Sequence, residues 1–248
     1  MEPRLVYVLH GCGRLRLSLR GGIVGLLLIL CASTLIPSLP LVPRVSAVTD
    51  QSLASAINSA YTSASPLGFE LTTNIYDNAG AGYMIGHRAS GKVVFTFNDS
   101  SRVNASNHQL TFGDFGSAVL VGGRLANPTV AFYEDHGSAP LTAVVHSNGT
   151  VSILHQPDGS VVLNVASSSV GASSDYFVME SLNDGGHVVI ILWGITQYGT
   201  LASGVYFNML FSNLVSLNQG SYVIYWQDSN SNGIPDPADT LTQVFSGS

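Results

Sequence analysis

The chain has 248 residues, of which 46% are hydrophobic and only 10% are charged, against about 25% charged in an ordinary soluble domain. Nine Lys and Arg against fifteen Asp and Glu give a net charge of −6, which argues against binding to nucleic acid or to an anionic membrane surface. Dense runs of Val, Ile, Leu and aromatic residues argue against disorder, because they supply the buried surface that disordered chains lack.

The first 47 residues have the pattern of a secretory signal. An arginine-containing segment is followed by an apolar run over 21–36, three prolines and a cleavage motif of small residues that ends at Ala47. We expect cleavage after Ala47. The alternative is an uncleaved membrane anchor, although a run of about 16 residues is shorter than the roughly 20 that span a bilayer. Both cysteines, Cys12 and Cys31, fall in this leader, so the rest of the chain has no disulfide and carries four basic against fourteen acidic residues, a net charge of −10.

After the leader, the sequence predicts a helix and then a series of short strands. Residues 50–62 have apolar side chains at helical spacing, with Asp50 as the expected N-cap. Short apolar stretches bounded by polar and glycine residues then predict strands. The expected segments are strands at 68–76, 82–87, 92–97 and 118–121, a polar loop at 98–109 and a helix at 127–135.

A three-stranded antiparallel meander is the clearest local prediction. Asn148-Gly149 and a second pair, Asp158-Gly159, are type I′ turn signals that separate three apolar segments. Apolar side chains fall on both faces of these segments, with Val144 beside Val151 and Ile153 on one face, so we expect both faces to be covered. The expected strands are 142–147, 150–156 and 161–165.

The C-terminal half predicts a βαβ unit beside this meander. The run V-V-I-I-L-W at 188–193 is continuously apolar, which is typical of a central strand. We therefore predict an α+β fold with a mixed, mostly antiparallel sheet and few helices, in a single domain over 48–227. The expected segments are a linker at 167–174, strands at 176–180, 188–193 and 222–226, a turn at 194–200 and a helix at about 200–214.

The strongest chemical signal is an acidic loop at 228–239. A calcium loop needs oxygen ligands at its first, third and fifth positions, a glycine at the sixth, a main-chain carbonyl at the seventh and carboxylates late. Gly233 falls at the sixth position. The loop resembles those of dockerin modules and thrombospondin type 3 repeats, and Asp at its twelfth position departs from the EF-hand. The expected Ca²⁺ ligands are Asp228, Asn230, Asn232, the carbonyl of Ile234, Asp236 and Asp239.

We expect weak, extracellular-type affinity for this loop, with a Kd of roughly 10⁻⁴–10⁻³ M. The alternative is a solvated Asn/Asp/Gly turn that holds no ion. Three N-x-S/T sequons, at Asn98, Asn104 and Asn148, are candidate glycosylation sites. In a chain this rich in Ser and Asn, chance occurrence of the sequons is an equal alternative.

The sequence singles out no catalytic residue. Gly194 and Gly199-Thr200 have the spacing of a phosphate-binding loop, but the lysine that should follow the second glycine is missing, which favours a tight strand-to-helix turn. His146 and His155 are expected roughly 13 Å apart on the hairpin, too far to share a metal. A Ser/His/Asp triad assembled by folding stays open.

Two further segments carry a family resemblance. The run V-L-V-G-G-R-L-A-N-P (Val119–Pro128) is similar to the V-G-G-P-x-A-N segment of archaeal S-layer proteins, with Arg124 where a proline usually stands. The run from Ile190 to Phe207, followed by a strand and the acidic loop, resembles the C-terminal part of exported archaeal S-layer-like proteins. This resemblance implies a cell-surface protein that associates with itself or with other envelope proteins, and it brings no catalytic residues.

The sequence thus predicts an extracellular, non-enzymatic structural protein that binds Ca²⁺. We expect no nucleic-acid partner, and membrane contact only through an uncleaved leader. The rival interpretation is a monomeric extracellular module that binds a ligand, or a hydrolase that acts on glycans or peptides.

Overall fold

The computed structural model describes residues 51–88, 93–98, 102–209 and 217–248, all of which belong to one compact unit, Arg44–Ser248. The predicted leader lies outside the described residues. Ten strands and four α-helices occupy the described part of the chain, which confirms the predicted α+β class. The helices are α2 (Leu53–Thr62), α3 (Ile75–Arg88), α4 (Pro128–Asp135) and α5 (Gln197–Met209), with a 3₁₀ turn, η1 (Ser167–Ser169).

The strands form two sheets. The smaller sheet is the predicted meander, and its three strands are antiparallel. It consists of β4 (Leu141–Val145), β5 (Thr150–His155) and β6 (Ser160–Ala166). The larger sheet has seven strands: β1 (Leu67–Glu70), β2 (Val94–Phe97), β3 (Ser117–Val121), β7 (Ser174–Asp184), β8 (His187–Gly194), β9 (Ser221–Gln227) and β10 (Thr240–Gly247).

The predicted central strand, β8, lies in the middle of the larger sheet, whose order is β10-β9-β7-β8-β3-β1-β2. Its run from Val188 to Trp193 is buried throughout, because both faces of the sheet are covered. β8, β3, β1 and β2 are parallel, whereas β7 is antiparallel to both β8 and β9. β7 therefore lies between β8 and β9, the two strands that α5 connects.

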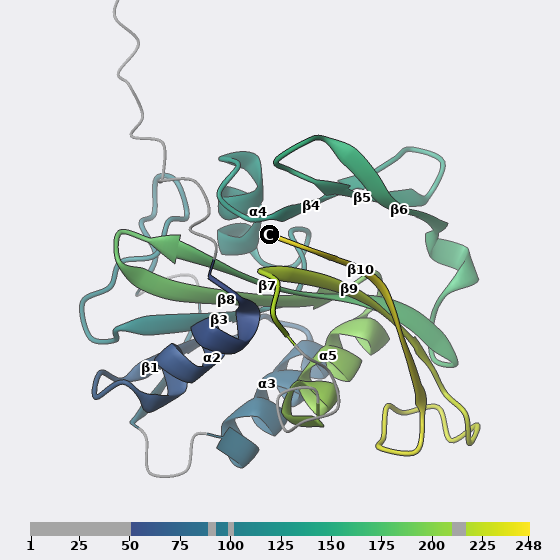
Figure 1. Ribbon diagram of the computed structural model, residues 1–248, viewed down its shortest axis with the longest axis horizontal. Coiled ribbons are helices and arrows are strands. Elements are labelled where there is room, and N and C mark those ends of the chain that lie inside the picture. Colours follow the sequence, from purple (N-terminus) through teal and green to yellow (C-terminus); the bar gives the residue numbers. More distant parts are fainter. Residues whose placement is uncertain (1–50, 89–92, 99–101, 210–216) are drawn as a thin grey trace, which may run out of the picture. The chain divides into compact units, whose positions relative to one another are not determined.

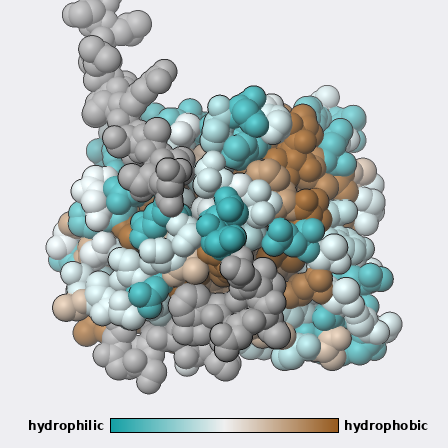
Figure 2. Space-filling model, in the orientation of Figure 1, coloured by the Kyte–Doolittle hydropathy of each residue, from teal (hydrophilic) through white to brown (hydrophobic). Residues whose placement is uncertain are grey.

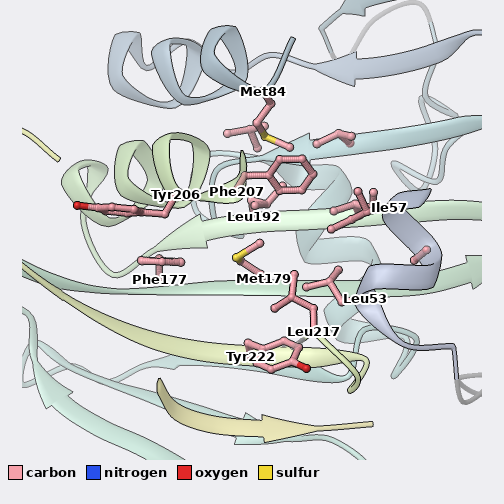
Figure 3. Close-up of a cluster of buried hydrophobic side chains, with 14 of the residues drawn as sticks. Leu53, Ile57, Met84, Phe177, Met179, Leu192, Tyr206, Phe207, Leu217 and Tyr222 are labelled. Atoms are coloured by element: carbon pink, nitrogen blue, oxygen red, sulfur yellow. The ribbon is translucent and has the colours of Figure 1, made fainter. Parts of the chain in front are cut away.

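The larger sheet is the middle of three layers. Helices α2, α3 and α5 cover one face, and α4 with the meander covers the other (Figure 1). On the first face, Ile57 of α2, Met84 of α3 and Phe207 of α5 gather over Met179 and Leu192 of the sheet (Figure 3). Burial of each such side chain stabilises the fold by about 1.5–3 kcal/mol. A second cluster of buried apolar side chains lies on the other face, so two apolar cores flank the sheet.

Helices α3 and α5 approach each other most closely where Gly80 and Gly204 meet. A Cβ atom placed on Gly204 would lie 2.3 Å from the carbonyl oxygen of Gly80 and 2.4 Å from its Cα. Only a hydrogen atom fits between these backbones. This contact brings the two helices close enough to cover the parallel half of the sheet together.

The structure corrects three predictions near the N-terminus. The strand expected at 68–76 ends at Glu70, and α3 begins at Ile75. The strand expected at 82–87 is wrong, because these residues belong to α3. Buried Ala81 and Met84 are spaced three residues apart, as one face of a helix requires. The predicted N-cap Asp50 is also wrong: α2 begins at Leu53, and the Oγ of Ser52 accepts a hydrogen bond from the Ser55 N–H (3.2 Å).

The predicted cover on both faces of the meander is wrong at its outer end. The register places Ala143, rather than Val144, beside Ile153 and Leu163. Val144 and Val145 are 36% and 49% exposed, because α4 and the larger sheet cover the inner face alone. The last strand, β10, was not predicted, since T-L-T-Q-V-F-S-G has no clear alternation of apolar and polar residues.

The Gly80–Gly204 contact predicts a sharp asymmetry between two glycine substitutions. Gly204→Ala should lower the free energy of unfolding by about 1–3 kcal/mol, because its Cβ meets backbone atoms that no rotamer change can move. Gly82→Ala in α3 meets no atom within 4 Å and should raise stability by about 1 kcal/mol through helix propensity. Urea unfolding measures both, and equal stability of the two variants would contradict this account.

Candidate calcium site

The acidic loop connects the last two strands of the larger sheet. Residues 228–239 lie between β9 and β10, and the pairing of Gln227 with Thr240 closes the loop at its base. In Figure 1 this loop extends at the lower right, beyond the end of the sheet. An antiparallel hairpin therefore fixes both ends of the predicted twelve-residue segment.

Asp228 organises the first half of the loop. Its Oδ1 accepts hydrogen bonds from the N–H groups of Asn230 (3.2 Å) and Asn232 (3.3 Å), and its Oδ2 accepts one from Gly233 (2.7 Å). Gly233 has φ +77°, a left-handed conformation that favours glycine. The sixth position thus turns the chain sharply around the carboxylate, as a calcium loop requires.

Asp236 brings the two asparagines together. Its Oδ2 accepts hydrogen bonds from the amide nitrogens of Asn230 (2.7 Å) and Asn232, and its Oδ1 accepts one from the Ala238 N–H (2.7 Å). These bonds, that of Asn230 first, lower the pKa of Asp236 below its usual value, so the group is ionised at neutral pH. Four of the predicted ligands, Asp228, Asn230, Asn232 and Asp236, therefore belong to one hydrogen-bonded cluster.

Asp239 contacts the cluster through the Asp236 backbone and anchors the loop to the protein. Its Oδ2 accepts hydrogen bonds from the indole of Trp226 (2.9 Å) and from the Asp236 N–H (2.9 Å), and its Oδ1 accepts one from the Ser229 N–H (3.0 Å). The Tyr206 hydroxyl of α5 lies 3.1 Å from the same Oδ2. Burial, followed by the charge of Asp239, raises the pKa of Tyr206, so this hydroxyl stays protonated and able to donate.

Ile234 has an exposed side chain, and its N–H donates to the Oδ1 of Asn232 (2.9 Å). Within the described part of the chain, no three His, Cys, Asp or Glu side chains converge as a metal site. An ion in this loop would therefore depend on the amide and main-chain oxygens beside Asp228 and Asp236. The anchoring residues Tyr206 and Trp226 were missed from the sequence, because neither lies within the loop motif.

The loop that resembles a phosphate site already holds an internal anion. Asp175 of β7 is buried, and its Oδ2 accepts hydrogen bonds from the N–H groups of Thr196 (2.9 Å) and Gly199 (2.8 Å) and from the Thr196 hydroxyl (2.7 Å). Burial raises the pKa of Asp175 to about 6, which leaves it mostly ionised at neutral pH. The N-terminus of α5 is thus occupied by the chain's own carboxylate, in agreement with a tight strand-to-helix turn.

Two buried glutamates hold the meander in place: Glu134 joins it to α4, and Glu180 joins it to β7 of the larger sheet. The Oε2 of Glu134 accepts hydrogen bonds from the Ala143 N–H (3.1 Å) and Arg124 (3.1 Å), and the Oε2 of Glu180 accepts one from the Leu141 N–H (2.8 Å). Burial raises the pKa of Glu134 to about 7. Burial, and then the charge of Glu134, raise the pKa of Glu180 well above its usual value. These carboxyls contact neighbouring elements of the protein rather than solvent.

A cleft of about 300 Å³ lies at the carboxyl ends of β1, β3 and β8, the edge where open α/β sheets bind ligands. Two ionisable side chains line it. The Oδ2 of Asp77 accepts a hydrogen bond from the Thr72 hydroxyl (3.0 Å), and Arg124 pairs with Glu134 (3.1 Å) and Asp135 (2.6 Å). Both are therefore engaged within the protein itself.

The histidines of the meander do not share a site. His146 contacts the Ser152 hydroxyl (2.8 Å), whereas His155 contacts Asp158 (3.0 Å). All three sequon asparagines are exposed: Asn98 follows β2, Asn104 lies in the loop before β3, and Asn148 lies at the tip of the β4–β5 hairpin. Their glycosylation stays a prediction.

Comparison with known proteins found no matching family model, no matching curated protein and no matching solved structure. In the described residues, every helix is too short or too polar to cross a bilayer.

The occupied N-terminus of α5 predicts that Asp175→Asn is destabilising. Because all the groups bound to the carboxylate are donors, an amide nitrogen at this position must face a donor. We expect a loss of about 2–3 kcal/mol in the free energy of unfolding. Gln197→Ala, in the first turn of the same helix, is the control and should change stability by less than about 0.5 kcal/mol. An Asp175→Asn variant as stable as this control would refute the proposed role.

The glutamate pair predicts a protein that is less stable at alkaline than at acidic pH. Because folding raises the pKa of Glu134 from about 4.5 to about 7, its contribution is present below pH 4.5 and is lost as pH rises through 7. Ionisation of Glu134 in the folded protein lowers the free energy of unfolding by about 3 kcal/mol, and ionisation of Glu180 lowers it further. Glu180→Gln imitates the protonated acid and should reduce the difference in unfolding free energy between pH 5 and pH 8. Ser169→Ala, which removes a hydrogen bond on an exposed turn and leaves the contacts of both glutamates unchanged, should keep that difference; the same difference in all three proteins would contradict the assignment.

Proposed function

We propose that this chain is an exported, non-enzymatic structural protein of the cell surface, S-layer-like, whose C-terminal loop binds Ca²⁺. The observation that carries the proposal is the cluster of Asp228, Asn230, Asn232 and Asp236 within a loop closed by a β-hairpin. Carboxylate, amide and main-chain oxygens are the ligands that Ca²⁺ prefers. The sharp turn at Gly233 holds them on a short segment.

The exchange of hydrogen bonds for coordination explains how an ion would be accommodated. Asn230 and Asn232 direct their amide nitrogens at the Asp236 carboxylate. Rotation of each amide exchanges its nitrogen for its oxygen. This turns two donors into two ligands, and it breaks the hydrogen bonds that the amide oxygens accept from the N–H groups of Asn232 and Ile234. Ca²⁺ would then neutralise Asp228 and Asp236, and the carbonyl of Ile234 would add a main-chain oxygen. The anchored carboxylate of Asp239 would couple this change to Trp226 and α5.

The surroundings of the buried acids favour a structural role. Asp175, Glu134 and Glu180 each accept hydrogen bonds that join one element of the fold to another. An acid or base in hydrolysis must instead reach the substrate. The rival ligand-binding function would be expected at the cleft beside Asp77.

The two segments that resemble S-layer-like proteins are neighbours in the fold. Val119–Pro128 contains most of β3 and the turn into α4, and Ile190–Phe207 contains most of β8 and α5. β3 and β8 are adjacent and parallel, so the two turns leave the sheet at the same edge. Their resemblance therefore concerns one continuous region, which supports the proposed surface role.

The calcium proposal predicts a stabilisation that depends on the loop. With a Kd of roughly 0.1–1 mM, 10 mM Ca²⁺ should raise the free energy of unfolding by about 1.4–2.7 kcal/mol. Thermal unfolding of residues 44–248 with Ca²⁺, and with Mg²⁺ as the ionic control, measures this. The double variant Asp228→Asn/Asp236→Asn should lose the Ca²⁺ shift, whereas Asp158→Asn, on an exposed turn of the meander, should keep it. No shift in the unmodified protein would refute the calcium site.

A further inference from the structure

Within the described part of the chain, the outer edge of β10 is an open sheet edge. β10 pairs only with β9 among the described strands, and within the described residues no backbone hydrogen bond joins it to any other element. Natural edge strands are normally protected by lysine, by proline, by a bulge or by a covering segment; β10 has a bulge between Gln243 and Phe245. The strand Thr240–Gly247 contains no charged residue and no proline.

An apolar surface lies alongside this edge. Val244 is 42% exposed at the point where a bulge interrupts the pairing of β10 with β9, and Val161 of β6 is 62% exposed. Half-buried Phe245 contacts the ring of His155 in β5 (5.4 Å between ring centroids) and so joins β10 to the meander. Figure 2 shows apolar side chains gathered at the upper right, over the meander and the last strand. We name this surface, defined by β10 and Val161, the edge seam.

The electrical neutrality of the edge seam indicates which partner fits it. Residues 48–248 carry a net charge of −10, so two copies repel each other over most of their surfaces. β6 and β10 contain no charged side chain, and the edge seam is therefore where a second copy can approach at low electrostatic cost. An antiparallel β10–β10 pairing about a two-fold axis is self-complementary and gives each strand the same new hydrogen bonds.

The edge seam is also continuous with the proposed ion site. Thr240, the first residue of β10, follows Asp239 directly, and its hydroxyl contacts that of Ser229 in the loop (2.8 Å). Order imposed on the loop would thus extend into the start of the edge strand. This connection rests on the proposed function.

We propose that the edge seam is a self-association surface, on which β10 of a second copy of this chain adds to the seven-stranded sheet, and that Ca²⁺ in the adjacent loop favours this pairing. Each copy then shields the apolar surface and the open hydrogen-bonding edge of the other.

The test is light scattering coupled to size-exclusion chromatography of residues 44–248, with and without 10 mM Ca²⁺. The unmodified protein should form dimers or larger assemblies, more strongly with Ca²⁺. Val244→Lys should weaken association at least tenfold, because it places a desolvated charge at the pairing edge. The matched control is Val93→Lys, next to β2 at the opposite edge of the same sheet, where the side chain is 61% exposed; it should associate as the unmodified protein does.

The outcomes separate the edge seam from the calcium site. Association that Val244→Lys does not weaken, or that Val93→Lys abolishes instead, overturns the edge seam and leaves the calcium proposal standing. A monomer under all conditions also overturns it. If Val244→Lys blocks association but Ca²⁺ does not shift thermal unfolding, the β10 pairing is supported. The proposal that Ca²⁺ favours this pairing is then rejected. Hydrogen exchange of the β10 amides, slower in the assembly than in the Val244→Lys monomer, checks the pairing directly.

Discussion

Hydrogen bonds to buried carboxylates are the constraint on which this fold depends. All three glutamates beyond the leader, Glu70, Glu134 and Glu180, are buried, and each accepts a hydrogen bond from a different element from the one that carries it. Such groups are costly without partners. Their donors therefore fix where α4 and the meander sit on the larger sheet. In a chain without disulfides beyond its leader, these bonds connect the layers.

The same principle extends to the end of the sheet. Asp239 gathers donors from Trp226 in β9 and from the loop backbone, and the Tyr206 hydroxyl of α5 lies beside it. One carboxylate thereby holds the base of the loop against the helix layer. The remaining acids of the loop, Asp228 and Asp236, are free to organise its outer part. A fixed base with an adaptable outer half suits the reversible binding of an ion.

The sequence was most informative where a local rule decides the structure. The central strand at 188–193, the meander strands and the loop at 228–239 each follow from residues close together in the chain, and the structure places them as expected. The type I′ turns are wrong, because Gly149 and Gly159 have positive φ but Asn148 and Asp158 do not. α3 was mistaken for a strand because its three glycines are unfavourable in a helix; contact with α5 explains Gly80, whereas a Cβ on Gly82 or Gly86 would meet no atom within 4 Å. Likewise, the partnership of Tyr206 with Asp239 joins residues 33 positions apart, and no local pattern indicates it.

Terbium luminescence tests the central claim, that the loop holds a calcium ion, most directly. The chain has two tryptophans, and Trp226 donates to Asp239 at the base of the loop. Excitation of tryptophan should therefore sensitise Tb³⁺ bound in the loop, and millimolar Ca²⁺ should displace the signal. Trp226→Phe should remove the signal, and Trp193→Phe should keep it. Luminescence that is absent, or that survives Trp226→Phe unchanged, would contradict an ion site in this loop.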